Sequence, residues 1–226
     1  VIIFARSKEK ALKVFPYLEE EEHLEIVLGD ISEPICYDGD IDYVIHGASP
    51  TSSKYFVSHP VETIGAAVDG TRYVLELAKQ KQVKGVVYLS SLEVYGTPAE
   101  DAGMITEKDY GYIEPLSVRS SYSEGKRIVE CLCASYAKEY DVPVKVARLS
   151  QTFGAGVAYD DGRVFAEFAR CAIEGKNIVL HTEGKTVRTY CYTIDAVTAL
   201  LTILAKGQAG KAYNVTNMDT AISIYD

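Results

Sequence analysis

Long apolar runs are absent from this 226-residue chain. No stretch approaches the roughly 18 residues of a membrane span, and no basic segment followed by an apolar one opens the sequence. We therefore expect a cytoplasmic protein with no membrane partner. The hydrophobic content of 47% is nevertheless sufficient for a sizeable buried core.

An excess of positive charge is also absent, because the formal net charge is −9 at pH 7. Affinity for nucleic-acid backbones comes mainly from clustered Lys and Arg, so we expect no nucleic-acid partner. Metal-ligand spacing is missing too, since the five cysteines form no Cys-x-x-Cys pair and no Cys/His cluster. We expect no metal site, and buried free thiols instead.

The chain does contain an alternation of strand-length apolar runs and helical patterns. The predicted strands are Val1–Phe4, Leu24–Leu28, Tyr43–His46, Gly85–Ser90 and Val144–Leu149. The predicted helices begin at Lys8, at Pro60, at Ser121 with a capping box to Glu124, near Arg163 and just after Asp195. This alternation indicates βαβ units, and hence a Rossmann-like α/β fold in which helices cover both faces of a doubly wound parallel sheet.

The pattern changes after Leu149 to a Gly-rich turn, a helix and short strand-like runs at Ile178–Leu180, Val187–Tyr192 and Ala212–Val215. We predict a dinucleotide-binding domain over residues 1–150 and a smaller substrate-binding lobe over residues 151–226. Residues 96–119 show no periodicity, and a loop of that length is usually functional or disordered. Because the chain opens on a strand and Ile222–Asp226 looks like the start of a helix, we expect a fragment that lacks both ends.

Three residues could together move a proton off an alcohol. Tyr122 and Lys126 are four residues apart, so on a helix their side chains share one face. An ammonium beside the phenol would favour the phenolate needed by a general base, and Ser91 could hydrogen-bond the same hydroxyl. Alone, this Tyr-x-x-x-Lys spacing also arises by chance in a chain with 17 Tyr.

These residues stand in an ordered set of motifs that resembles the extended short-chain dehydrogenase/reductase family, the NAD-dependent epimerase/dehydratase group acting on nucleotide sugars. The matching elements are Gly29-Asp30-Ile31, His46-Gly47-Ala48-Ser49-Pro50, Gly70-Thr71, Leu89-Ser90-Ser91 with Tyr95-Gly96, Tyr122-x-x-x-Lys126, Arg148–Gly154 and Val187–Tyr190. The closest resemblance within the family is to UDP-glucuronate decarboxylase, or UDP-xylose synthase. The stretches carrying that closer match are Ala48-Ser49-Pro50 with Tyr55 and Pro60, Ser91–Gly96, Arg119–Arg127 and Asp161–Val164.

The resemblance implies an NAD cofactor, a nucleotide-sugar substrate and a homodimer formed through the helices after Pro60 and Ser121. The implied cofactor-binding residues are Arg6, Asp30, Ile31, Gly47, Ala48, Ser49, Ser90, Tyr122 and Lys126. The implied catalytic residues are Ser91, Glu93, Tyr122, Lys126 and Arg188, and the implied substrate-binding residues are Tyr55, Ser91, Gln151, Thr152, Arg163 and Arg188. Arg163 could equally be a plain surface charge, and His46 is expected to be structural.

Glu93 bears on which reaction the resemblance implies. If Tyr122 takes the proton of the sugar's 4-hydroxyl while hydride leaves C4 for NAD, the resulting 4-ketone makes a C5 carboxylate a β-keto acid that loses CO2 easily. In the decarboxylases, a Glu placed like Glu93 and an Arg placed like Arg188 take part at this step. The 4,6-dehydratases carry an Asp-Glu pair, and the Asp position here is Leu92.

We therefore expect an enzyme, a lyase or isomerase, that oxidises the sugar's C4 hydroxyl to a transient 4-ketone, with UDP-glucuronate decarboxylation as the first choice. A 4-epimerase, then a 4,6-dehydratase or reductase, remain open, as does a non-catalytic dinucleotide-sensing protein of the same fold. Glu93 could also be a solvated loop carboxylate, and Arg188 a charge on a strand face.

Three departures from the family pattern qualify this expectation. The expected fragment lacks the family's first strand, the Gly-rich turn that receives the pyrophosphate, and the first helix. Arg6 stands where an acid often selects NAD, so NADP is a second possibility. Gln151 replaces an Asn that is usual before Thr-Phe-Gly, which leaves the identity of the sugar open.

Overall fold

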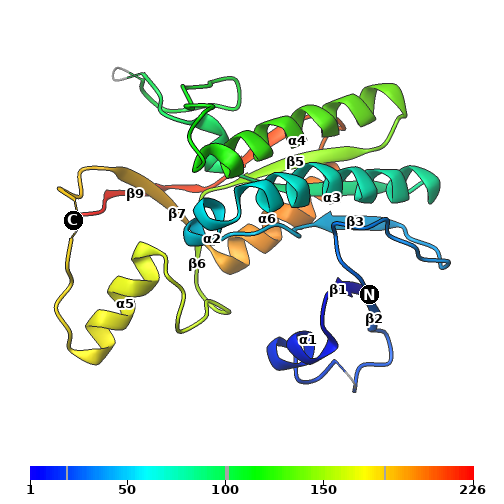
Figure 1. Ribbon diagram of the computed structural model, residues 1–226, viewed down its shortest axis with the longest axis horizontal. Helices are drawn as coiled ribbons and strands as arrows, with labels where there is room; N and C mark the ends of the chain where they lie inside the picture. The colour runs from blue at the N-terminus through cyan, green and yellow to red at the C-terminus, as the bar shows by residue number, and fades with distance from the viewer. Residues whose placement is uncertain (19, 100–101, 181) are drawn as a thin grey trace.

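The computed structural model describes residues 1–18, 20–99, 102–180 and 182–226. Its largest sheet is parallel throughout, in the order β3 (Tyr43–His46), β4 (Gly85–Ser91), β5 (Val144–Leu149) and β8 (Ala212–Val215). Strand β1 (Ile2–Ala5) pairs in parallel with β2 (Glu25–Leu28) in a separate two-stranded sheet, with α1 (Lys8–Val14) between them in the chain. Figure 1 shows this N-terminal unit beside β3, at the side of the molecule away from the C-terminus.

Helices cover both faces of the large sheet because β4 is apolar on both sides. On one face, Val86 and Tyr88 pack in a buried cluster with residues of α3 (Pro60–Gln80) and α4 (Ser120–Glu139). On the other face, Val87 packs in a second cluster with residues of α6 (Thr193–Lys206). The predicted Rossmann-like α/β architecture is thereby confirmed, since a strand buried on both faces is what a helix-covered parallel sheet requires.

The termini of the helices follow their sequences. Helix α3 has Pro60 in its first turn, Glu62 beside its N-terminus and Lys79 in its last turn, as the helix dipole favours. Helix α5 (Val164–Glu174) stops at Gly175, whose positive φ of 65° forms a left-handed C-cap. A short α2 (Ser53–Ser58) precedes α3, and the sequence pattern does not predict it.

The C-terminal segment contributes to two sheets. Strands β6 (Gln151–Phe153), β7 (Val187–Tyr192) and β9 (Asn217–Ser223) form a three-stranded sheet, which lies with α5 on the opposite side from the N-terminal unit in Figure 1. Strand β8 instead pairs with β5, and α6 packs on the large sheet. The division into domains at residue 150 stays a prediction, and the larger sheet draws elements from both sides of that position.

Three local predictions are wrong. Residues Ile178–Leu180 are not a strand, and no strand pairs with them among the described residues. In place of the helix start expected at Ile222–Asp226, Ile222 and Ser223 end β9, which pairs antiparallel with β7, and residues 224–226 follow it without regular structure. The capping box also fails, because α4 starts at Ser120 and the Ser121 hydroxyl donates to the Phe56 carbonyl 3.3 Å away.

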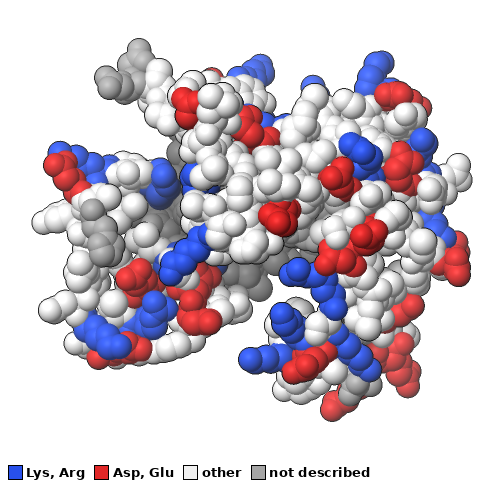
Figure 2. Space-filling view, viewed as in Figure 1, with Lys and Arg blue, Asp and Glu red and all other residues white. Residues whose placement is uncertain are grey.

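The thiols and the surface charges are distributed as follows. All five cysteines are free; Cys133 and Cys191 are buried, whereas Cys36 and Cys131 are exposed, so the expectation of buried thiols holds only in part. Basic and acidic side chains are interspersed over the face seen in Figure 2. None of the helices in the described part of the chain is long and apolar enough to cross a membrane.

Candidate active site

A cleft of about 810 Å³ opens where β4 and β5 end, between the large sheet and the three-stranded sheet. The carboxyl ends of parallel strands are the usual place for ligand sites in α/β folds. Glu93 and Arg119 line it from the β4 side, Gln151 follows β5, and Arg188 comes from β7. Residues far apart in the sequence therefore share one solvent-accessible cavity.

The structure brings Ser91, Tyr122 and Lys126 together beside this cleft. Ser91 ends β4 and hydrogen-bonds the Tyr122 hydroxyl. The Tyr122 ring stacks on Phe56 of α2, with centroids 4.3 Å apart and an interplanar angle of 9°. Lys126 lies one turn further along α4, where its Nζ donates to the Leu89 carbonyl at 2.8 Å. The phenol and the ammonium thus reach the end of β4 from one face of one helix, as their spacing predicts.

The electrostatic effect of Lys126 on Tyr122 differs from the expectation. Burial raises the pKa of Tyr122, while the Ser91 hydrogen bond and the Arg119 charge oppose that rise. The Lys126 ammonium is 5.6 Å from the centroid of the Tyr122 ring and bonds a backbone carbonyl instead. Its own pKa is lowered from 10.5 to about 8 because it is buried. The expected lowering of the tyrosine pKa by this ammonium is therefore wrong for this structure.

Glu93 is held on both of its oxygens. Arg119 Nη2 donates to Oε1 and the Ser123 hydroxyl donates to Oε2, each at 2.9 Å. The alternative of a solvated loop carboxylate does not describe this arrangement. No role is predicted from the sequence for Arg119 or Ser123, although they stand three residues before Tyr122 and one residue after it. Two signals were available: helical spacing brings Arg119 to the same face as Tyr122, and the stretch Arg119–Arg127 carries part of the resemblance to the family.

Arg188 and the substrate-binding candidates lie in different settings. Arg188 Nη1 donates to the carbonyl of Val187 at 3.1 Å, and both residues line the cleft. Arg163 is exposed and pairs with Asp161 at 2.6 Å, which fits the surface-charge alternative. Thr152 lies in β6, opposite Cys191 of β7. Tyr55 stacks on His59, with centroids 4.6 Å apart, at the end of α2.

The residues expected at the adenosine end lie where β1, β2 and β3 end. Arg6 and Asp30 are exposed, and the hydrogen bonds from Ser32 to Asp30, with the nearby Arg6 charge, lower the pKa of that carboxyl. A Cβ on Gly70 would meet Ile31 Cγ1 at 2.8 Å, so this glycine lets the loop after β2 approach α3. Asp30 Oδ1 accepts hydrogen bonds from the Ser32 amide at 3.0 Å and from the Ser32 hydroxyl at 2.9 Å.

Gly47, Ala48 and Ser49 follow β3, where Gly47 and Ala48 are exposed. Ser49 is half-buried and donates to the Pro50 carbonyl at 3.3 Å. Ser90 is different: it is buried and its hydroxyl donates to Glu130 at 2.6 Å. His46 is buried and bonds Thr71 at 2.9 Å, and burial lowers its pKa to about 3, in line with the structural role expected for it.

These residues fit the two ends of a dinucleotide. At one end Asp30, which follows β2, would accept a hydrogen bond, and at the other Tyr122 and Lys126, on α4 beside the end of β4, would donate. The chain's own glycines do not form a Gly-rich turn between β1 and α1, where the sequence is Ala5-Arg6-Ser7. No group of His, Cys, Asp and Glu suited to holding a metal ion occurs among the residues that the structure describes.

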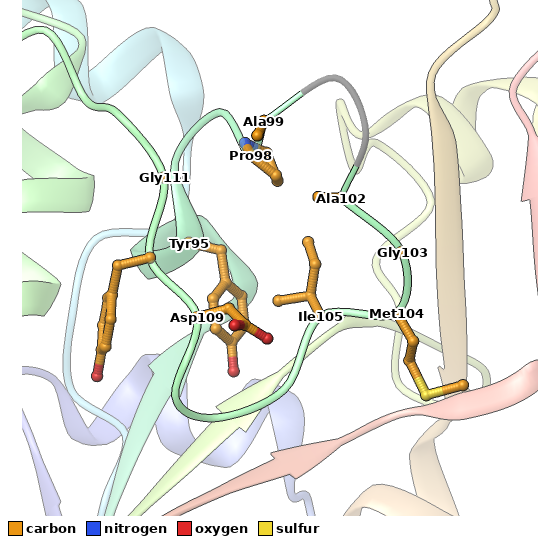
Figure 3. Close-up of a pocket in the computed structure, with 10 residues that line it drawn as sticks. Tyr95, Pro98, Ala99, Ala102, Gly103, Met104, Ile105, Asp109 and Gly111 are labelled. Carbon is orange, nitrogen blue, oxygen red and sulfur yellow. The ribbon is translucent and has the colours of Figure 1, made fainter.

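A buried ion pair connects the loop over the cleft to the sheet. Arg148 of β5 bonds Glu130 of α4 at 2.7 Å, and it also bonds the hydroxyls of Tyr95 and Tyr110 and the carbonyl of Glu107. Beneath the same loop is a smaller cavity of about 240 Å³, and Figure 3 shows Tyr95 and Ile105 pointing into it. The sequence did not single out this network, which fixes residues 107–110 beside the site.

Most of the chain matches one family of known proteins. Residues 8–216 match the model of the NAD dependent epimerase/dehydratase family. UDP-glucuronic acid decarboxylase 6 of Arabidopsis thaliana is 33% identical over 186 residues, which is 82% of this chain and 53% of that protein. UDP-glucuronic acid decarboxylase 1 of Xenopus tropicalis is 32% identical over 183 residues, or 81% of this chain and 42% of that protein. The chain thus spans about half the length of the curated relatives it matches.

Solved structures share the fold. A UDP-glucuronic acid 4-epimerase from Bacillus cereus in complex with NAD matches with a TM-score of 0.80 and 22% identity, over 100% of this chain and 72% of that one. A dTDP-glucose 4,6-dehydratase from Streptomyces venezuelae with NAD bound matches with a TM-score of 0.78 and 22% identity, over 95% of this chain and 65% of that one. At these identities the likeness concerns the fold alone.

Proposed function

We propose that this chain, which belongs to the NAD dependent epimerase/dehydratase family, carries the catalytic site of a UDP-glucuronate decarboxylase. Glu93 is the observation that supports this choice: it lies in the cleft that Arg188 also lines, and Arg119 and Ser123 place it beside Tyr122. The neighbouring position in the cleft wall is Leu92, so a second carboxylate for an elimination is absent there. The named decarboxylases at 31–33% identity support the same choice.

NAD is the cofactor of this proposal, and when bound it accepts a hydride from the sugar's C4 and later returns it. Tyr122 is the group proposed to take the proton from the C4 hydroxyl, because it shares a hydrogen bond with Ser91 at the end of β4 and its helix neighbour Ser123 lines the cleft. Lys126 keeps a positive charge next to the site on the buried face of α4. NADP is the second choice, because Arg6 is suited to binding its 2′-phosphate; the nearby Asp30 carboxylate, which carries the opposite charge, favours NAD.

The resulting 4-ketone makes the C5 carboxylate of a uronic acid a β-keto acid, so CO2 leaves with little further help. Arg188 is placed on the far wall of the cleft to bind the negative charge of the substrate, at its diphosphate or at the departing carboxylate. Glu93 lies on the near wall, where it can exchange protons with the sugar. Charged groups that are already held in place stabilise the charge developing in the transition state more strongly when the site excludes water.

The test is to incubate the intact protein with NAD and carboxyl-labelled UDP-glucuronate, and to measure labelled CO2 and a UDP-pentose. Tyr122→Phe should lower the rate by about 10²–10⁴-fold, because proton transfer by a positioned side chain contributes that much. Tyr140→Phe, at the exposed end of the same helix, is the matched control and should leave the rate unchanged. A product that retains its carboxylate would contradict decarboxylation and favour a 4-epimerase.

A homodimer is the second part of the proposal. Besides their buried faces, α3 and α4 carry exposed apolar side chains at Val61, Ile64 and Ile128, with exposures of 76%, 46% and 51%. Val61 and Ile64 are one turn apart on α3, and α3 packs against α4 in one core cluster. Exposed apolar residues on two adjacent helices form a surface suited to a second copy of the same pair.

A further inference from the structure

The region between Glu93 and Tyr122 carries a positive charge to which the reaction above assigns no role. Arg119 lies three residues before Tyr122, at the N-terminal end of α4. Its guanidinium bonds Glu93 at 2.9 Å and lies 5.2 Å from the centroid of the Phe56 ring, the ring on which Tyr122 stacks. Arg119 is thus a close charged neighbour of the hydroxyl that would deprotonate the sugar.

The Arg119 side chain is also accessible to a bound substrate, unlike the buried Arg148 of the same cleft. Three arginines line the described part of the cleft wall, namely Arg119, Arg148 and Arg188. Arg148 has a side chain only 2% exposed, and its donors are taken by Glu130, two tyrosine hydroxyls and a carbonyl. The Arg119 side chain is 38% exposed and its ion pair is with Glu93, whose side chain is 35% exposed.

The two available arginines lie on different walls. Arg188 is on β7, on the wall formed by the three-stranded sheet. Arg119 is close enough to Tyr122 for its charge to affect the pKa of that hydroxyl, and its partner Glu93 follows Ser91 by two residues, so it lies at the end of the cleft where the sugar must place its reacting C4. The C5 carboxylate of a hexuronate is one carbon away from C4, so it comes within reach of the guanidinium that is nearest to Tyr122.

We propose that Arg119 selects a uronic acid by exchanging its ion pair, so that the substrate carboxylate takes the place of Glu93 on the guanidinium. A planar guanidinium suits this exchange, because it binds any carboxylate in a two-point geometry. Glu93 keeps the hydrogen bond from Ser123 and gains a free oxygen toward the sugar. The selection step and the release of Glu93 are then the same event. This inference rests on the proposed function for the identity of the sugar.

The exchange predicts opposite effects for its two partners. Arg119→Gln removes the cation, so the affinity for UDP-glucuronate should fall by about 10- to 100-fold, as expected for a hydrogen bond to a charged group. Glu93→Gln removes the competing carboxylate, so UDP-glucuronate should bind more tightly than to the wild type even though turnover falls. Arg119→Lys should recover part of the affinity. A purely structural role for Arg119 predicts none of this pattern.

The experiment is calorimetric titration of the intact protein with NAD, using UDP-glucuronate, UDP-glucose and UDP as separate ligands. Selective loss of UDP-glucuronate binding in Arg119→Gln, with UDP-glucose and UDP within about twofold of the wild type, supports the proposal. Lys84→Gln, which breaks an exposed 2.7 Å pair to Asp42 just before β4, is the matched control. Unaltered binding of UDP also reports that the variants are folded.

Three outcomes would overturn the exchange: equal loss of all three ligands in Arg119→Gln, an unchanged preference for UDP-glucuronate, or weaker UDP-glucuronate binding in Glu93→Gln. None of these binding measurements requires turnover. A wild type whose preference for UDP-glucuronate depends on Arg119, but which releases no CO2, would therefore support the exchange and refute decarboxylation.

Discussion

Removal of the Glu130 carboxylate should destabilise the fold more than any other charge deletion near the site. This carboxylate accepts hydrogen bonds from Arg148 Nε at 3.0 and 3.2 Å, from Arg148 Nη2 at 2.7 Å and from the Ser90 hydroxyl at 2.6 Å. The side chains of Arg148 and Glu130 are only 2% and 11% exposed. Glu130→Ala leaves the Arg148 guanidinium buried without a counter-charge, and this group cannot become neutral by losing its proton. We therefore expect the free energy of unfolding to fall by about 3–5 kcal/mol.

Two further variants test whether the loss of stability comes from leaving one buried charge without a partner. Glu124→Ala, on the same helix, breaks a 3.8 Å pair with Arg127 in which Glu124 is 40% exposed, and it should cost no more than about 0.5 kcal/mol. The double variant Glu130→Leu with Arg148→Met removes both charges, so it should be more stable than Glu130→Ala alone. Urea denaturation followed by circular dichroism measures all of these free energies of unfolding.

Two results of the same denaturation measurements would refute this reasoning. If Glu130→Ala costs less than about 1 kcal/mol, the guanidinium is compensated by water or by other partners, and the pair does not hold the structure together. If the double variant is less stable than Glu130→Ala, the charges themselves, and not the unpaired state of one of them, account for the stability. Faster proteolysis at residues 107–110 in Glu130→Ala would further locate the damage in the loop over the cleft.

Three other changes test separate features. Burial lowers the pKa of Lys126 to about 8, so the unfolded chain binds this proton more strongly than the folded one. The free energy of unfolding should therefore rise by up to about 3 kcal/mol as the pH rises from about 8 to 10.5. In urea denaturation over this pH range, Lys126→Met should lack that rise. Gly96→Ala places a Cβ against the Tyr112 carbonyl oxygen at a φ of +63°, so in thermal melts it should cost about 1–3 kcal/mol, while Gly162→Ala, in open space, should be neutral. Val61→Glu should convert the proposed homodimer to a monomer in sedimentation analysis, and an unchanged mass would exclude α3 from the interface.

The sequence alone was sufficient for the features that depend on neighbours within about ten residues. Apolar runs bounded by turn residues predicted β3 and β5 with the bounds that the structure has. Pro60 and the helical spacing after it predicted α3. The four-residue interval from Tyr122 to Lys126 predicted their common helix face. These features are local because backbone periodicity is written in short stretches of chain.

Only the tertiary structure decided which groups are partners, because contacts across the sequence depend on strand register and on which side chains lose water. The pairing of β4 with β5 places Ser90 opposite Arg148, and α4 then brings Glu130 to both. The balance of burial and charge likewise raised the pKa of Tyr122 where spacing predicted a decrease. The sequence determined that a tyrosine and a lysine share a helix; folding determined that Arg119 holds Glu93 beside that tyrosine.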